Sequence, residues 1–304
     1  MGKKASSRHI SEVGNYGDER EFYASRYVLE HAPPNDPDAV IGALEEFDVR
    51  WTMLHLGREK GEFLDRAVED VVSERWKATG QRGTMQREDG PRVRALEIGA
   101  YIGYSAIRIG RILAAEGGFG STLLSVEQNE DNAGYAKVHV EYSGLGETVT
   151  VLRSRIENCF DDDESSSTEA GATGVTDETT GNNNRPYDFV FLDHRKPFYL
   201  RDLKLLESRG VIDSDVTTVV ADNVGSLEHV RNREEAIARG KRKGPCRCVN
   251  KACDYLEYVK RRWSSTELFY GDNTKDGISV SKPLTACALE NRCPVASPIE
   301  TTIN

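Results

Sequence analysis

The chain has 304 residues, a formal net charge of −10 and 38% apolar residues. This length fits one large domain or two small ones. The acidic balance argues against general nucleic-acid binding, which needs a positive surface. No segment approaches the roughly 18–20 consecutive apolar residues of a membrane-spanning helix, so we expect no transmembrane segment and a cytoplasmic protein.

Residues 1–18 are expected to form a solvated, disordered N-terminus. The start MGKKASSR also fits the N-myristoylation pattern, with Gly2 behind Met1 and Ser6 at the required place. A lipid on Gly2 would then give a weak membrane contact, which is the alternative for this segment. The apolar core of a cleaved secretory signal is missing.

The segment 19–77 predicts N-terminal helices, over 19–31, 37–50 and 61–76. Asp36 and Pro37 are typical of a helix cap followed by proline at the first helical position. Apolar residues then recur at helical spacing in both later segments. Residues 78–91 are expected to be a loop.

From residue 93 the pattern changes to short apolar strands that alternate with helices. The expected strands are 93–98, 122–127, 148–153, 187–192, 217–222, 266–271 and 277–282, and the expected helices are 104–116, 130–144, 200–210 and a segment around 252–259. Such alternation predicts an α/β fold in which a mostly parallel seven-stranded sheet has helices on both faces. We assign one domain to 19–282, with its α/β core over 93–282. Sheets of this kind bind ligands at the carboxyl ends of their strands.

Three segments do not fit this pattern. Residues 161–184 carry seven acids and no bases, and we expect a disordered insertion there. Residues 239–250 form a basic loop, and 283–304 a C-terminal tail. Three cysteines near the basic loop, Cys246, Cys248 and Cys253, match no standard zinc spacing, so we expect unpaired thiols.

Gly99 and Gly103 lie in the turn between the first strand and the next helix, and Glu127 ends the second strand. Glycine allows close backbone approach, and a helix N-terminus offers free N–H groups. An acid at the tip of the second strand can hold both hydroxyls of a ribose; the alternative is that Glu127 caps the following helix. Because the spacing is not G-x-G-x-x-G, a nucleoside without diphosphate is favoured over the cofactor of a nucleotide-dependent dehydrogenase.

Asp193 ends the fourth strand, and Asp222 and Asn223 end the fifth. Neighbouring parallel strands would bring these side chains to one edge of the sheet. Carboxylate and amide oxygens are hard ligands that suit Mg²⁺. The alternative is that these residues cap helices or turns, as Asp and Asn often do.

The motifs LEIGAYIGYSA, SVEQNED, FLDHRK and ADN, with WTMLHLGREKGEFLD upstream, resemble the catechol O-methyltransferase family over about residues 45–282. The resemblance implies a single Rossmann-like class I methyltransferase domain, S-adenosylmethionine as methyl donor and Mg²⁺ as cofactor. It implies that Asp193, Asp222 and Asn223 bind the metal and that Lys196 is the general base. Lys196 must be neutral to accept a proton.

The same resemblance assigns further residues to the donor and to a small aromatic diol. The implied donor-binding residues are Leu56, Gly99, Tyr101, Gly103, Ser105, Glu127, Gln128 and His194; the implied substrate contacts are Trp51, Arg195 and Asp272.

Two of these positions depart from the family pattern. Arg195 replaces an aromatic residue, and we expect it to favour acidic catechols such as caffeate or protocatechuate over catecholamines. The local sequence YLEY at 255–258 contains Glu257, but helical spacing places it in the helix before the sixth strand, which leaves Asp272 for the second substrate hydroxyl.

The main alternative is a methyltransferase-like binding or regulatory protein without turnover. The complete set Asp193, Lys196, Asp222 and Asn223 favours an enzyme, because a degenerate copy would be expected to have lost some of these residues. We expect a monomer.

Overall fold

The computed structural model describes residues 16–79, 90–160, 185–240, 252–270 and 276–283. Seven strands form one sheet in the order β3-β2-β1-β4-β5-β7-β6. The strands are β1 (Arg94–Ile98), β2 (Thr122–Glu127), β3 (Val149–Arg153), β4 (Phe189–Leu192), β5 (Thr218–Ala221), β6 (Ser265–Phe269) and β7 (Ile278–Lys282). The first five are parallel, whereas β7 is antiparallel to both of its neighbours. The prediction of a mostly parallel seven-stranded sheet is confirmed.

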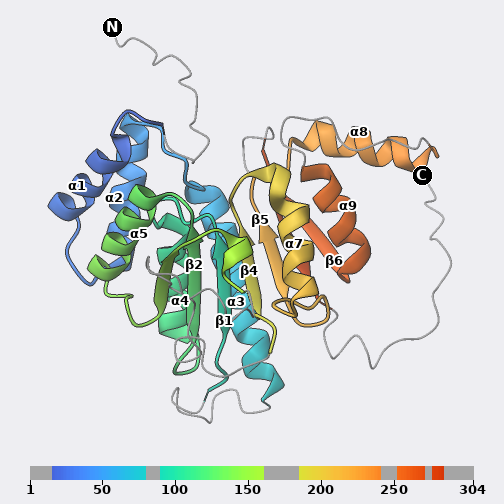
Figure 1. Cartoon of the computed structure of the whole chain (residues 1–304), viewed down its shortest axis with the longest axis horizontal. Helices are drawn as coiled ribbons and strands as arrows, with labels where there is room; N and C mark the ends of the chain where they lie inside the picture. The colour runs from blue at the N-terminus through green and yellow to red at the C-terminus, as the bar shows by residue number, and fades with distance from the viewer. Residues whose placement is uncertain (1–15, 80–89, 161–184, 241–251, 271–275, 284–304) are drawn as a thin grey trace, which may run out of the picture.

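Helices lie on both faces of this sheet (Figure 1). They are α1 (Arg20–His31), α2 (Pro37–Arg50), α3 (Arg58–Ala78), α4 (Tyr104–Glu116), α5 (Glu130–Tyr142), α7 (Tyr199–Ser208), α8 (Leu227–Ala238) and α9 (Ala252–Arg262), with short 3₁₀ turns η2 (Ile156–Asn158) and η3 (Lys196–Phe198). The extra N-terminal helices are present as predicted. The sequence did not predict α8, which carries its few apolar residues without a clear helical period. None of the helices in the described ranges is long and apolar enough to span a membrane.

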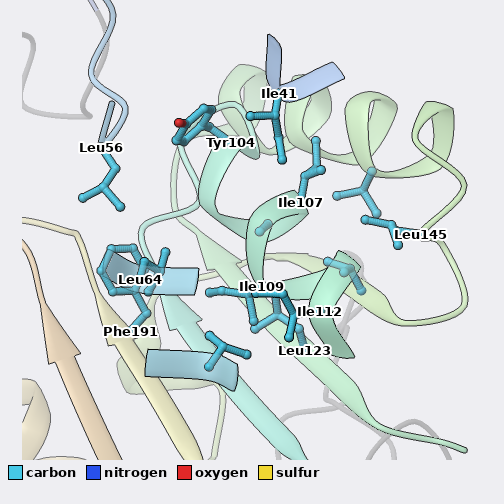
Figure 2. Close-up of a cluster of buried hydrophobic side chains, with 14 of the residues drawn as sticks. Ile41, Leu56, Leu64, Tyr104, Ile107, Ile109, Ile112, Leu123, Leu145 and Phe191 are labelled. Atoms are coloured by element: carbon cyan, nitrogen blue, oxygen red, sulfur yellow. The ribbon is translucent and has the colours of Figure 1, made fainter. Parts of the chain in front are cut away.

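Both faces of the central strands are buried, because their residues alternate between two apolar clusters. In β4, Phe189 and Phe191 join the cluster that α3 and α4 cover, and Val190 and Leu192 join the cluster under α7 and α9. Figure 2 shows the first cluster, in which Phe191 and Leu64 lie next to the side chains of α4. This two-sided burial explains why the central strands are short apolar runs.

Helices α1 and α2 pack at the β3 end of the sheet, where α1 lies beside α5, whereas α3 packs beside α4 over the central strands (Figure 1). Asp36 caps α2 by accepting a 2.9 Å hydrogen bond from the Ala39 backbone N–H, as the Asp-Pro pair predicted. Tyr16 and Asp18 fall in the predicted disordered start, yet both contact α1: the Tyr16 N–H donates to Glu21, and Asp18 pairs with Arg20.

A buried ion pair fixes the start of α3 against α4. Arg108 of α4 donates two hydrogen bonds to Asp65, at 3.1 and 2.6 Å. Gly61 leaves room for this arginine, since a Cβ there would lie 2.7 Å from the guanidinium carbon. The first turn of α3 is thereby held at one fixed position relative to the sheet.

Four predicted segments lie wholly or largely outside the described residues: the N-terminus up to residue 15, the acidic insertion 161–184, the basic loop from residue 241, and the tail from residue 284.

Candidate active site at the carboxyl edge of the sheet

The turn after β1 is tied to the tip of β2 through Glu127. The Tyr101 backbone N–H donates to Glu127 Oε2 at 2.9 Å, and the Asn129 N–H donates to Oε1 at 2.8 Å. Tyr101 has a left-handed backbone with φ of 48°, an uncommon conformation that points to a constrained, functional turn. Burial raises the pKa of Glu127, and the backbone N–H bonds oppose that rise. Backbone N–H groups do not fill all of the roughly four acceptor sites of a carboxylate, so Glu127 can still accept from another donor.

The two glycines of this turn are required by chain packing. Gly99 has φ of 101°, and a Cβ there would lie 2.7 Å from the backbone carbonyl carbon of Asp193. A Cβ at Gly103, which has φ of 92°, would lie 3.1 Å from Ala136 of α5. Gly99 therefore brings the turn after β1 into direct contact with the tip of β4, and the two halves of the site meet there.

Glu97, which sequence analysis did not single out, lies fully buried in β1 beneath this turn. Ser125 of β2 donates a hydrogen bond to it, and the predicted donor residue Ser105 is also buried beside it. Burial raises the pKa of Glu97 to about 7, while Ser105 and Ser125 oppose that rise. The signal in the sequence was an acid between the apolar residues Leu96 and Ile98 of this strand.

The tips of β4 and β5 bring two buried carboxyl groups together. Burial raises the pKa of Asp193 well above its usual range, and the nearby charge of Asp222 raises it further. Asn223 follows with a left-handed backbone, φ 55°, and its Nδ2 donates to Asp222 Oδ2 at 2.7 Å. The Tyr199 hydroxyl donates to the Asp222 backbone carbonyl at 3.0 Å, which fixes the β5 tip from below.

Lys60, from the first turn of α3, also reaches this pair, although the sequence gave no reason to expect it. Its Nζ lies 2.7 and 2.9 Å from the two carboxylate oxygens of Asp222 and 3.0 Å from Asp276 Oδ2. Burial lowers the pKa of Lys60, but the Asp222 and Asp276 carboxylates together raise it more, so the net shift is upward. Because 162 residues separate Lys60 from Asp222, no local spacing could have shown this contact.

Lys196 begins η3, three residues after Asp193, and its side chain is 23% exposed. Its Nζ lies 3.7 Å from Asp193 Oδ1, so the predicted base stands at the border between the buried carboxyl groups and solvent.

His194 turns away from this cluster toward α7. Its Nε2 lies 2.8 Å from Asp202 Oδ2, and its Nδ1 is buried without a hydrogen-bond partner among the described residues. Burial lowers the pKa of His194, and Asp202 opposes this effect. The Nδ1 atom is therefore a buried polar atom without a partner among the described residues.

The other predicted residues lie in different surroundings. Leu56 is 5% exposed and belongs to the apolar cluster of Figure 2, whereas Gln128 is exposed. Trp51 is 44% exposed and meets the rings of Tyr23 and Phe47 edge-on.

Three residues considered for the substrate side have distinct placements. Arg195 is exposed, with its guanidinium 5.5 Å from the Phe198 ring centre. Asp272 lies outside the described residues. Glu257 lies in α9, as its helical spacing predicted, and pairs with Arg233.

Within the described ranges, no group of three or more His, Cys, Asp and Glu side chains is arranged to hold a metal ion. The predicted trio contributes two carboxylates and one amide. Since Asn223 uses its nitrogen to bind Asp222, the amide oxygen is the atom that remains for a cation. Two mutually repelling buried carboxyl groups beside an amide oxygen form a donor set that fits a hard divalent ion.

The sheet order, with helices on both faces, defines a Rossmann-like α/β protein. Comparison with known proteins narrows this class to O-methyltransferases. No protein-family model matches the chain. The bovine catechol O-methyltransferase is 32% identical over 228 residues, which cover 71% of this chain and 67% of the relative. A probable O-methyltransferase of Mycobacterium tuberculosis is 34% identical over 221 residues, covering 72% and 79%.

Among solved structures, an O-methyltransferase from Bacillus cereus in complex with SAH matches with a TM-score of 0.48 at 17% identity, covering 86% of this chain and 90% of that chain. The curated relatives establish the family: this chain belongs to the catechol O-methyltransferase family. It is therefore an enzyme of the methyltransferase class.

Proposed function

We propose that the protein transfers a methyl group from S-adenosylmethionine to one hydroxyl of a catechol or related vicinal-diol aromatic, with Mg²⁺ as cofactor. The observation that carries the proposal is the meeting of Asp193, Lys196, Asp222 and Asn223 at the tips of β4 and β5, next to the glycine turn. The family of the chain supports the reaction class.

The residues around the glycine turn fit the methyl donor. Glu127, at the tip of β2 beside the glycine turn, would accept hydrogen bonds from the ribose hydroxyls. His194 would lie near the adenine, where its free Nδ1 can form a hydrogen bond. The methionine part would lie along the turn itself, and we assign it to Leu56, Gly99, Tyr101 and Ser105, with Gly103 and Gln128 at the borders of the donor site.

Asp193, Asp222 and Asn223 would hold the Mg²⁺ ion. A bound divalent ion would lower the pKa of a coordinated phenol and fix two vicinal oxygens relative to the donor. Asp193 and Asp222 lie close enough to affect each other's charge, and a bound divalent ion would favour their carboxylate forms, which would balance its charge.

Lys196 acts as the general base on the attacking hydroxyl. A free phenol has a pKa of about 10, and its oxyanion is the better nucleophile. Neutral Lys196 accepts the phenolic proton on Nζ, and the substrate oxygen attacks the sulfonium methyl in line. The new O–C bond forms as the C–S bond breaks, so that the donor leaves as a neutral sulfide. Positioning of the two substrates supplies much of the rate.

The substrate would lie between the metal-binding edge and solvent. Trp51 would form one wall, Asp272 would contact the second hydroxyl, and Arg195 would face the ring substituent. An exposed guanidinium attracts a carboxylate and repels an ammonium group. We therefore propose acidic catechols as the preferred substrates.

We further propose a cytoplasmic monomer, with lipidation of Gly2 as the alternative that would add a weak membrane contact. Mass spectrometry of the chain from a eukaryotic host distinguishes the two, because a free or acetylated N-terminus excludes the lipid.

The decisive experiment is a methyl-transfer assay over a panel of catechols and their mono-methyl ethers, with Mg²⁺ and with EDTA. The proposal predicts S-adenosylhomocysteine formation with vicinal diols only, loss of activity in EDTA and recovery on adding Mg²⁺. Calorimetry with S-adenosylmethionine and NAD accompanies it. Donor binding without turnover on any catechol would favour the alternative of a regulatory protein, and NAD binding alone would favour a dehydrogenase.

A further inference from the structure

Lys60 occupies the side of the Asp222 carboxylate on which a cation would bind. Its ammonium group contacts both Asp222 oxygens, at 2.7 and 2.9 Å, and this carboxylate is 3% exposed. Asn223 already donates to Oδ2 at 2.7 Å. Both oxygens of the carboxylate are therefore engaged by nitrogen donors, and a divalent ion that binds Asp222 meets the positive charge of Lys60 at the same carboxylate unless the ammonium group moves.

Asp276 offers the ammonium group a second acceptor. Its Oδ2 lies 3.0 Å from Lys60 Nζ, just before β7, and its side chain is 27% exposed. Lys60 can thus give up an Asp222 oxygen without becoming a buried, unpaired charge, which would be costly. The backbone of Lys60 stays in place meanwhile, because Gly61 and the Arg108–Asp65 pair fix the start of α3.

We propose that Lys60 is a built-in cation that competes with the divalent metal for Asp222, and that Asp276 retains its ammonium group when the metal binds. This inference rests on the proposed function, in which Asp222 is a metal ligand. In the metal-free protein Lys60 compensates the repulsion between Asp193 and Asp222. The competition sets a threshold concentration of divalent ion below which the site stays closed by its own lysine.

The test is the affinity of the full-length protein for Mn²⁺ alone, measured from the EPR signal of the unbound ion after removal of metals with EDTA. Lys60→Met removes the competing charge, and we expect Mn²⁺ to bind at least about tenfold more tightly. Lys60→Arg keeps the charge and the two acceptors, so its affinity should stay within about threefold of the wild type. An unchanged or weaker affinity of Lys60→Met would overturn the inference.

Asp276→Asn distinguishes competition from a simple sum of charges. Without Asp276, Lys60 is held by Asp222 alone, and Mn²⁺ should bind more weakly. If Asp276 acts through Lys60, Asp276→Asn should weaken Mn²⁺ binding less when Lys60 is already methionine. The factor by which it weakens binding should be at least about threefold smaller in the Lys60→Met background than in the wild type. Equal factors in both backgrounds would show independent charges and contradict the role given to Asp276.

The ion pair Lys282–Asp70 supplies a matched control. It also joins the end of β7 to α3, at 2.9 Å, but it is more exposed and lies at the opposite end of β7 from Asp276. Lys282→Met should leave Mn²⁺ affinity within about twofold of the wild type. If Lys282→Met bound Mn²⁺ as tightly as Lys60→Met, the gain in affinity would come from the change in net charge alone, which would contradict the role given to Lys60.

Thermal unfolding of the same variants gives a second measurement. Metal-free Lys60→Met should unfold at a lower temperature, because Asp222 loses its partner, and saturating Mn²⁺ should restore more of its stability than in the wild type. If the wild type binds no Mn²⁺ at all, the metal site of the proposed function fails; if it binds Mn²⁺ and Lys60→Met does not bind it more tightly, only the inference fails.

Discussion

Buried carboxyl groups lie in both halves of the carboxyl edge of the sheet, the β1–β2 side and the β4–β5 side, but their hydrogen-bond and charge partners differ. On the β1–β2 side, Glu97 and Glu127 receive hydrogen bonds from a serine hydroxyl and from backbone N–H groups. On the β4–β5 side, Asp193 and Asp222 face the ammonium groups of Lys196 and Lys60. One half is satisfied by fixed neutral donors, and the other by mobile cations.

This difference matches two kinds of ligand. Backbone donors cannot leave, so the first half is a rigid frame whose remaining lone pairs suit neutral hydroxyls. An ammonium group on a flexible stem can be displaced, so the second half can exchange one cation for another. We propose on this basis that the same functional group, the carboxyl group, prepares one half for the nucleoside of the donor and the other half for a metal ion.

The largest expected effect tests the second half. Lys196→Met should lower kcat by about 10²–10⁴-fold, because it removes the base while leaving Asp193 and Asp222 in place. Steady-state kinetics measure the loss, and Mn²⁺ should still bind, because Asp193, Asp222 and Asn223 all remain. Lys204→Met serves as the control and should keep wild-type kcat. Lys204 lies on α7, and its ammonium group faces the ring of Tyr258 on α9. A normal kcat in Lys196→Met would remove the assigned base.

The next effect tests the buried acid of the first half. The pKa of Glu97 rises from 4.5 to about 7 on folding, so its favourable contribution is complete below pH 4.5 and is lost as the pH rises toward 7. Between pH 5 and 8 this loss is about 2–3 kcal/mol in the free energy of unfolding. Urea unfolding should show that Glu97→Gln lacks this part of the pH dependence. Parallel pH profiles for variant and wild type would contradict it.

Glu127→Gln tests whether the frame holds the donor. The amide keeps one acceptor oxygen and loses the charge, which should raise the KM for S-adenosylmethionine by about 10- to 100-fold. Mn²⁺ affinity should not change, since the proposed metal site lies in the other half. Glu130→Gln is the matched control, because Glu130 is exposed and pairs with Arg153. Loss of metal binding in Glu127→Gln would show that the halves are not separate.

The smallest effect concerns substrate choice. Arg195→Trp should reduce the ratio of kcat/KM for protocatechuate to that for dopamine by about two- to fivefold, as expected for an exposed charge pair. Competition assays with the two catechols measure this ratio directly. An unchanged ratio would mean that Arg195 does not select acidic substrates.

Local pattern was sufficient for most of the fold. The strands and helices predicted from apolar periodicity were found within a few residues of their expected ends, because each is a short, strongly patterned segment. The sequence order did not reveal that β7 enters the sheet antiparallel between β5 and β6. It also missed α8, whose exposed, charged sequence lacks the apolar stripe of a packed helix.

The residues of the candidate site also divide into those that the sequence could predict and those that it could not. Asp193, Asp222 and Glu127 stand at the ends of strands, so the topology of a parallel sheet was enough to group them. Lys60 and Asp276 could not be found like this, because their partners are distant in the chain and their types are common on surfaces. The sequence also could not show why packing requires Gly99, because the reason is the close approach of the tip of β4 to the turn after β1.

The amino-acid order by itself determined which segments form strands and helices, and which polar residues stand at the strand tips, because periodicity and turn chemistry act between near neighbours. Only the tertiary structure decided which lysine faces which carboxylate. Charge pairing acts through space, and a buried acid takes the nearest donor that the packed elements bring to it, however far away that donor lies along the chain.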